Sequence, residues 1–201
     1  MGQYINPGNA GFAEIDDEDY VDKTMLIDFI NQTVEKKNKL TCVTRPRRFG
    51  KSFAAKMLAA YYDCSCDSRA LFFDKKIAST KDYDIYLNYY NVIYLDITAF
   101  TSVVRATGLS FRDVPKMIAE ELFKDLCENG FEPKDGDSVN DLLLRHVGKN
   151  NKKPFIFIID EWDTVIREAK EDDIAQEAYF QLLRGWFNNA KFTPKVVAAA
   201  L

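Results

Sequence analysis

The stretch Leu40-Thr-Cys-Val-Thr-Arg-Pro-Arg-Arg-Phe-Gly-Lys-Ser-Phe53 carries the feature that decides the fold. Its first part, Leu40 to Thr44, has the apolar and β-branched character of a short buried strand. A polar turn follows, and Phe53, Met57 and Tyr61 then mark one apolar face at helical spacing. The order strand, loop, helix predicts an α/β unit with a loop whose amides point at an anion.

The loop ends in Gly50-Lys51-Ser52, the last part of the phosphate-binding pattern G-x-x-x-x-G-K-[ST]. Arg45 replaces the first glycine, so the pattern is incomplete, and Gly-Lys-Ser by itself also occurs at ordinary turns into helices. In the phosphate-binding interpretation, Lys51 reaches the β and γ phosphates and the Ser52 hydroxyl binds Mg²⁺. The predicted nucleotide-binding residues are Arg45, Pro46, Arg47, Arg48, Phe49, Gly50, Lys51, Ser52 and Phe53.

A second motif, far along the chain, decides between these interpretations. The run Phe155-Ile-Phe-Ile-Ile159 predicts a buried strand, and Asp160-Glu161 ends it. An aspartate at the tip of a buried strand costs desolvation free energy unless it meets a cation or hydrogen-bond donors. Asp160 is therefore predicted to complete a Mg²⁺ shell with Ser52, although it could also simply cap the next segment. Glu161 is the predicted general base and, with Lys51, the predicted catalytic pair.

The rest of the chain alternates between strand and helix patterns, which predicts a mostly parallel sheet. Asn91 to Ile97 is a predicted strand and Lys195 to Leu201 begins another. Side chains of Asp22 to Thr24 are expected to cap the first helix, and Ser110 and Ser138 to open capping boxes. Predicted helices cover Leu26 to Val34, Phe53 to Tyr61, Phe111 to Leu126, Leu142 to Val147 and Ile174 to Ala190.

Length and composition favour one globular domain. The 201 residues are 47% apolar and carry a net charge of −4, which argues against a dominant nucleic-acid surface. No signal peptide or membrane-length apolar run is present, so a cytoplasmic protein is expected. The spacing of the four cysteines favours reduced thiols rather than a zinc site, and His146, the only histidine, is expected to pack or lie at the surface.

Three motifs together resemble the AAA-ATPase-like family of bacterial and archaeal proteins. They are Gly11-Phe-Ala-Glu14 with Tyr20-Val-Asp-Lys-Thr24, Thr44-Arg-Pro-Arg-Arg-Phe-Gly-Lys-Ser52 and Phe157-Ile-Ile-Asp-Glu-Trp-Asp163. The family's own loop has arginine and proline where the general pattern has glycine.

The resemblance implies a P-loop nucleoside triphosphatase with a three-layer sandwich over residues 1–201, including a lead-in at 1–23. It implies ATP as ligand, Mg²⁺ as cofactor, and a restriction-endonuclease-like nuclease domain following in the full-length protein. Because the sequence ends within an apolar strand pattern, we expect the carboxyl-terminal part of the domain to be missing. A homo-oligomer is compatible with the sequence.

Other functions remain open at this point. The chain could be a nucleotide-gated interaction module with little or no hydrolysis, or a P-loop kinase that passes phosphate to a small acceptor. Direct DNA binding through Arg45, Arg47 and Arg48 is a further alternative, which the acidic balance disfavours.

Overall fold

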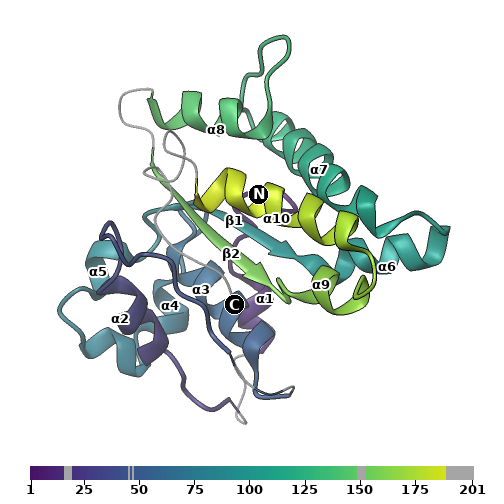
Figure 1. Cartoon of the computed structure of the whole chain (residues 1–201). Helices are drawn as coiled ribbons and strands as arrows, with labels where there is room; N and C mark the ends of the chain where they lie inside the picture. Colours follow the sequence, from purple (N-terminus) through teal and green to yellow (C-terminus); the bar gives the residue numbers. More distant parts are fainter. Residues whose placement is uncertain (16–19, 45, 47, 149–152, 189–201) are drawn as a thin grey trace.

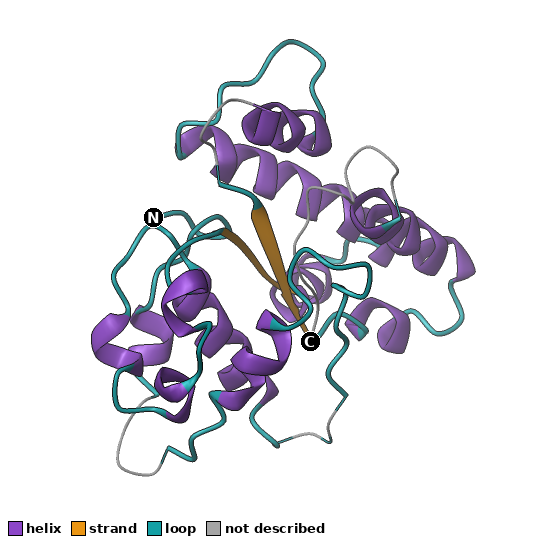
Figure 2. Ribbon diagram, turned by 90° about the vertical axis from the view of Figure 1, so that its left-hand side faces the viewer, coloured by secondary structure: helices purple, strands orange, loops and turns teal. Residues whose placement is uncertain are grey.

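The computed structural model describes residues 1–15, 20–44, 46, 48–148 and 153–188. Two strands lie at the centre, with helices on both sides (Figures 1 and 2). The elements are, in chain order, α1 Ala10–Ala13, α2 Met25–Asn31, α3 Lys51–Tyr62, α4 Arg69–Phe72, η1 Lys76–Ser79, α5 Tyr83–Tyr86, β1 Asn91–Asp96, α6 Ile97–Thr107, η2 Phe111–Asp113, α7 Val114–Glu128, α8 Val139–Gly148, β2 Phe155–Asp160, α9 Thr164–Glu168 and α10 Asp173–Phe187.

The two strands confirm the predicted α/β class and the parallel pairing. β1 and β2 run parallel, in a register that places Asn91 opposite Phe155 and Asp96 opposite Asp160. Every residue of β2 is buried, as its continuous apolar run predicts for a strand covered on both faces. The register brings the two strand-end carboxylates side by side at one edge of the sheet.

Each face of the sheet supports its own hydrophobic core, because successive side chains of a strand point to opposite faces. Ile93 and Phe157 pack on one face with residues of α6, α7, α8 and α10. Val92 and Ile158 pack on the other face with residues of α1, α2 and α3. The same apolar strands therefore hold two groups of helices on opposite sides, as Figure 2 shows.

The amino-terminal residues run along the outer edge of β1. Ile5 forms an antiparallel bridge with Ile93, and the N–H of Asn6 donates to the carbonyl of Val92 at 2.7 Å. The buried carboxylate of Asp125 in α7 holds this segment, accepting from the N–H groups of Gln3, Tyr4 and Ile5 at 2.9, 2.7 and 2.8 Å. The segment thus satisfies backbone groups at the edge of the sheet.

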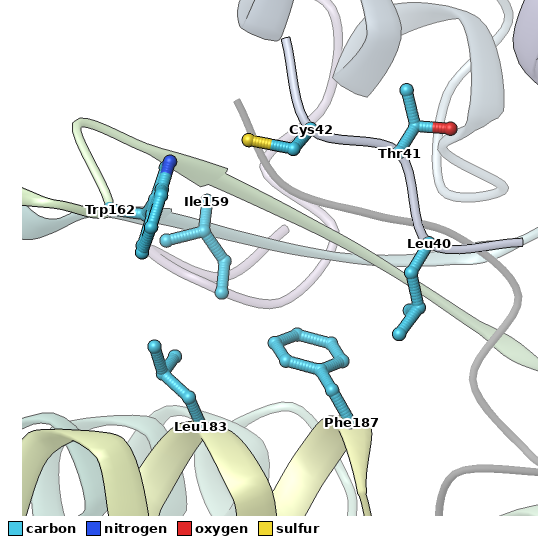
Figure 3. A pocket seen from close by; sticks show the side chains of 7 residues that line it. All are labelled: Leu40, Thr41, Cys42, Ile159, Trp162, Leu183 and Phe187. Atoms are coloured by element: carbon cyan, nitrogen blue, oxygen red, sulfur yellow. The ribbon is translucent and has the colours of Figure 1, made fainter. Parts of the chain in front are cut away.

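The prediction of a strand at Leu40 to Thr44 is wrong. These residues lie in the described part of the chain and form neither helix nor strand. A strand needs a partner for its backbone groups, and β2 pairs there only with β1. An apolar groove of about 240 Å³ separates the segment from β2 and α10 (Figure 3). Its lining residues are Leu40, Thr41, Cys42, Ile159, Trp162, Leu183 and Phe187. The predicted strand at Lys195 to Leu201 lies outside the described residues.

The predicted helices are confirmed as α2, α3, α7, α8 and α10, whereas α6 and the short helices α1, α4, α5 and α9 were not predicted and one predicted cap is wrong. Capping boxes open η2 at Ser110 and α8 at Ser138. The Thr24 side chain makes no cap on α2: its hydroxyl donates to Asp22 and accepts from the N–H of Ile77, so it ties the lead-in to η1. In the described part of the chain, no helix has the length and apolar character needed to cross a bilayer.

We expect Asp125→Asn to lower the free energy of unfolding by about 1 to 3 kcal/mol. The two charged carboxylate oxygens of Asp125 accept from three backbone N–H groups, whereas asparagine offers them a single, uncharged oxygen. Urea denaturation followed by circular dichroism measures the change. Glu128→Gln, at an exposed position of the same helix, is the matched control and should change little. Equal stability of the two variants would contradict the role given to Asp125.

Candidate functional site

The site is built at the start of α3. Gly50 precedes this helix in the left-handed conformation, with φ of 74°, which glycine adopts without steric cost. A Cβ at Gly50 would also lie 2.9 Å from the Nζ atom of Lys23. The positive φ therefore favours glycine here, whereas the end of the flexible Lys23 side chain could move aside. The chain turns directly into a helix of 12 residues whose first amides are open to a ligand.

A cavity of about 690 Å³ opens over this helix start. Its walls come from the loop, from the first turn of α3 and from the segments that follow β1 and β2. Most of the predicted binding residues line it, and Phe49 lines the cavity beside it. Arg45 and Arg47 lie outside the described residues. The lining residues are Pro46, Arg48, Gly50, Lys51, Ser52, Phe53, Thr98, Arg105, Glu161, Thr164, Arg167 and Glu168.

Asp160 lies beneath this cavity at the end of β2, with only 2% of its surface exposed. The Ser52 hydroxyl hydrogen-bonds its carboxylate, so the loop and the acidic strand end are in direct contact. Burial raises the pKa of Asp160, and the nearby charges of Asp96 and Glu161 raise it further, while the hydrogen bond from Ser52 opposes the rise. A buried carboxylate with a raised pKa is a place where a cation would be favourable.

Glu161 extends from the strand end into the cavity. Its backbone has φ of 51°, a conformation that is costly for a residue other than glycine and that often occurs at functional sites. Its N–H donates to Oδ1 of Asp160 at 3.0 Å. Its carboxylate lies 3.7 Å from Nζ of Lys51 and 2.6 Å from a guanidinium nitrogen of Arg167. The carboxylate therefore lies between two cations.

Arg167 in α9 is the main residue that the sequence did not single out. It donates to Oγ1 of Thr164 at 2.8 Å and forms an ion pair with Asp163 at 3.2 Å. Beside it, Arg105 of α6 and Glu168 form a second ion pair across the cavity wall. The spacing of Asp163 and Arg167, four residues apart on a helix, was the available signal for this network.

The arrangement fits a small oxygen-binding cation better than a protein-enclosed metal. Among the described residues, no three His, Cys, Asp or Glu side chains form a metal-binding group. Ser52 and Asp160 supply two adjacent oxygen donors at the cavity floor. Mg²⁺ characteristically takes one or two carboxylates and completes its shell with water and phosphate oxygens, so these residues fit it.

The remaining reactive side chains lie away from this cavity. All four cysteines, each within the described part of the chain, are free thiols. His146 stacks on Phe131, with ring centroids 4.1 Å apart, which confirms its packing role.

Comparison with curated proteins and with solved structures found no match. A family model described as "Predicted AAA-ATPase" matches residues 8–201, nearly the whole chain. The match covers the lead-in motif, the loop before α3 and the acidic end of β2. The chain therefore belongs to the AAA-ATPase-like family, a family of predicted AAA-ATPases.

Proposed function

We propose that the chain is a P-loop ATPase domain with a three-layer sandwich fold, extending over residues 1–201 with a lead-in at 1–23. One observation carries the proposal. Lys51 and Ser52 of the loop line one cavity with Glu161, which is far away in sequence, and Ser52 hydrogen-bonds the buried Asp160 next to it. These are the residue types that hold and hydrolyse a nucleoside triphosphate.

Binding would use the residues Arg45 to Phe53. The amides at the start of α3 and the positive end of its dipole would bind the phosphate oxygens, with Gly50 allowing close approach. Lys51 would add a flexible positive charge near the β and γ phosphates. Arg48, which also lines the cavity, could add bidentate hydrogen bonds to phosphate oxygens.

Ser52 and Asp160 would hold Mg²⁺. An ion held by these two residues would supply positive charge against the charge that develops on the phosphoryl oxygens. The hydroxyl and carboxylate already touch, so the two donors need little rearrangement.

Glu161 would act as the general base that orients and deprotonates the attacking water. Arg167 would position its carboxylate, since it contacts one oxygen while Lys51 lies near the other. Phosphate binding would draw Lys51 away from Glu161, which leaves one cation on the carboxylate and frees an oxygen to accept a proton. Turnover would then drive or gate a downstream effector, such as a nuclease-like domain following in a longer chain, in the cytoplasm where ATP is available.

We expect Lys51→Ala to lose most of the affinity for Mg-ATP, because it removes the flexible cation from the phosphate site. Isothermal titration calorimetry at one protein concentration measures binding. Lys116→Ala is the matched control, since this lysine is 74% exposed on α7 and lies outside the residues that line the cavity. Unchanged affinity in Lys51→Ala would contradict the phosphate site.

For Glu161→Gln, we expect retained Mg-ATP binding and a fall in multiple-turnover phosphate release by about 10²- to 10⁴-fold, the usual contribution of a general base. The amide keeps the shape of the side chain but cannot accept the proton. If the wild type hydrolyses ATP and the variant hydrolyses it equally fast, Glu161 is not the base. If neither turns over although both bind, the chain is the nucleotide-gated interaction module.

Asp160→Asn should raise the melting temperature near pH 7 in metal-free, nucleotide-free buffer. The folded-state pKa of Asp160 is raised, so the folded protein is relatively more stable at low pH and loses this stability as pH rises through that pKa. Asparagine removes the charge and retains an oxygen for Ser52 and for the N–H of Glu161.

The difference in melting temperature between Asp160→Asn and wild type should shrink as the pH is lowered toward the ordinary aspartate pKa. Differential scanning fluorimetry across this range, with Asp135→Asn at an exposed loop position as control, measures it. A variant less stable than wild type at pH 7 would contradict the account of Asp160 as a costly buried charge. In the same variant, Mg²⁺ should contribute less to ATP affinity.

A further inference from the structure

We propose that a second cavity, beside the phosphate loop, receives the base and ribose of the bound nucleotide. The proposal rests on the function proposed above. This cavity has a volume of about 540 Å³, and one side is formed by the lead-in and the other by the loop and the start of α3. We call it the lead-in cavity; its lining residues are Glu14, Ile15, Tyr20, Val21, Lys23, Arg48, Phe49, Gly50, Phe53 and Ala54.

The lining has the chemistry of a nucleoside site. Phe49 is 61% exposed and Phe53 is 51% exposed, so two aromatic rings on one short segment face water. Aromatic rings bind bases by stacking, and a base placed here would cover apolar surface that otherwise stays hydrated. Glu14 and Lys23 add polar groups that could face the ribose and the base edge.

The wall opposite the loop is already held in place. The Tyr20 ring packs edge-on against Phe12, with centroids 5.5 Å apart, and its hydroxyl lies 3.3 Å from Sδ of Met57 in α3. Nζ of Lys23 donates to the carbonyl of Phe49 at 2.9 Å, which joins the lead-in to the loop. The cavity is therefore formed before a ligand enters, which lowers the ordering cost of binding.

The two cavities meet where a nucleotide would need to pass from one to the other. Arg48, Gly50 and Phe53 line both of them. At the far side of the phosphate cavity, Glu161 fixes the position of the γ-phosphate, because the attacking water must lie within hydrogen-bond reach of the base. The α-phosphate and the nucleoside then lie toward the shared residues, and the lead-in cavity is the space beyond them.

The apolar groove of Figure 3 is the alternative place for a base, and its position argues against it. It lies between the segment at Leu40, strand β2 and helix α10. None of the described residues that line it also lines the phosphate cavity. A base seated there would lack the direct connection to the phosphate cavity that the lead-in cavity has.

The test compares ATP with inorganic tripolyphosphate, both with Mg²⁺, by calorimetry on the same chain. Tripolyphosphate occupies only the phosphate cavity, whereas ATP occupies both. For Phe53→Ala we expect about tenfold or greater loss of ATP affinity, from the lost stacking, and a clearly smaller loss of tripolyphosphate affinity, because the ring also lines the phosphate cavity. Phe53→Tyr, which keeps a ring, should retain ATP affinity. Phe73→Ala, at a phenylalanine 68% exposed and outside both cavities, is the matched control.

The outcomes separate this inference from the function on which it rests. Equal losses of ATP and tripolyphosphate affinity in Phe53→Ala would overturn it, because the ring would then support the loop and not the base. Unchanged ATP affinity in both Phe53→Ala and Phe49→Ala would also overturn it, leaving the two rings as a surface for another partner. Failure of the wild type to bind either ligand would instead refute the phosphate site itself.

Discussion

The whole site depends on one buried carboxylate. Asp160 lies at the end of a strand that is buried on both faces, and a neighbouring strand places Asp96 next to it in register. Such a charge is unfavourable without donors or a cation. Two donors meet this charge: the N–H of Glu161, at 3.0 Å, and the hydroxyl of Ser52, which comes from the helix that follows the phosphate loop. The hydrogen bond between Ser52 and Asp160 therefore connects the two motifs beside the cavity.

Around this contact, charged side chains of the protein form ion pairs with one another. Lys51, Glu161 and Arg167 form a short chain of alternating charge, and Arg105 with Glu168 continues it along the wall. A polyanion entering the cavity competes with these internal pairs. Part of the favourable free energy of ligand binding then offsets the loss of the ion pair between Lys51 and Glu161. The affinity for the ligand is therefore coupled to the rearrangement of Glu161.

Much of this was predictable from the sequence, because local patterns dominate in the elements concerned. The short apolar run at Phe155 to Ile159, with a proline before it and acidic residues after it, favoured a buried strand, and the glycine before Lys51 marked the helix start. Helix α6 was missed because β-branched residues such as Ile97 and Thr98 favour strands, while Asp96 caps a helix by accepting from the N–H of Thr98 at 2.9 Å. The strand predicted at Leu40 to Thr44 was wrong because a strand-like sequence forms a strand only when a second strand pairs with its backbone, and none does so among the described residues. In the site, the sequence holds only a weak signal for Arg167, its spacing of four from Asp163, because most charged pairs at that spacing lie on solvent-exposed helix faces.

The amino-terminal segment beside β1 has a consequence for the order of events during synthesis. Its backbone is held by Asp125, and the N–H of Ile5 and its acceptor are 120 residues apart in the chain. At typical elongation rates, about 6 to 24 s separate their appearance on the ribosome. During that interval residues 3–5 can meet β1 but lack the Asp125 carboxylate that accepts from their N–H groups. The hydrogen bonds from residues 3–5 to Asp125 therefore form late and over a long range, after both β1 and α7 have been made.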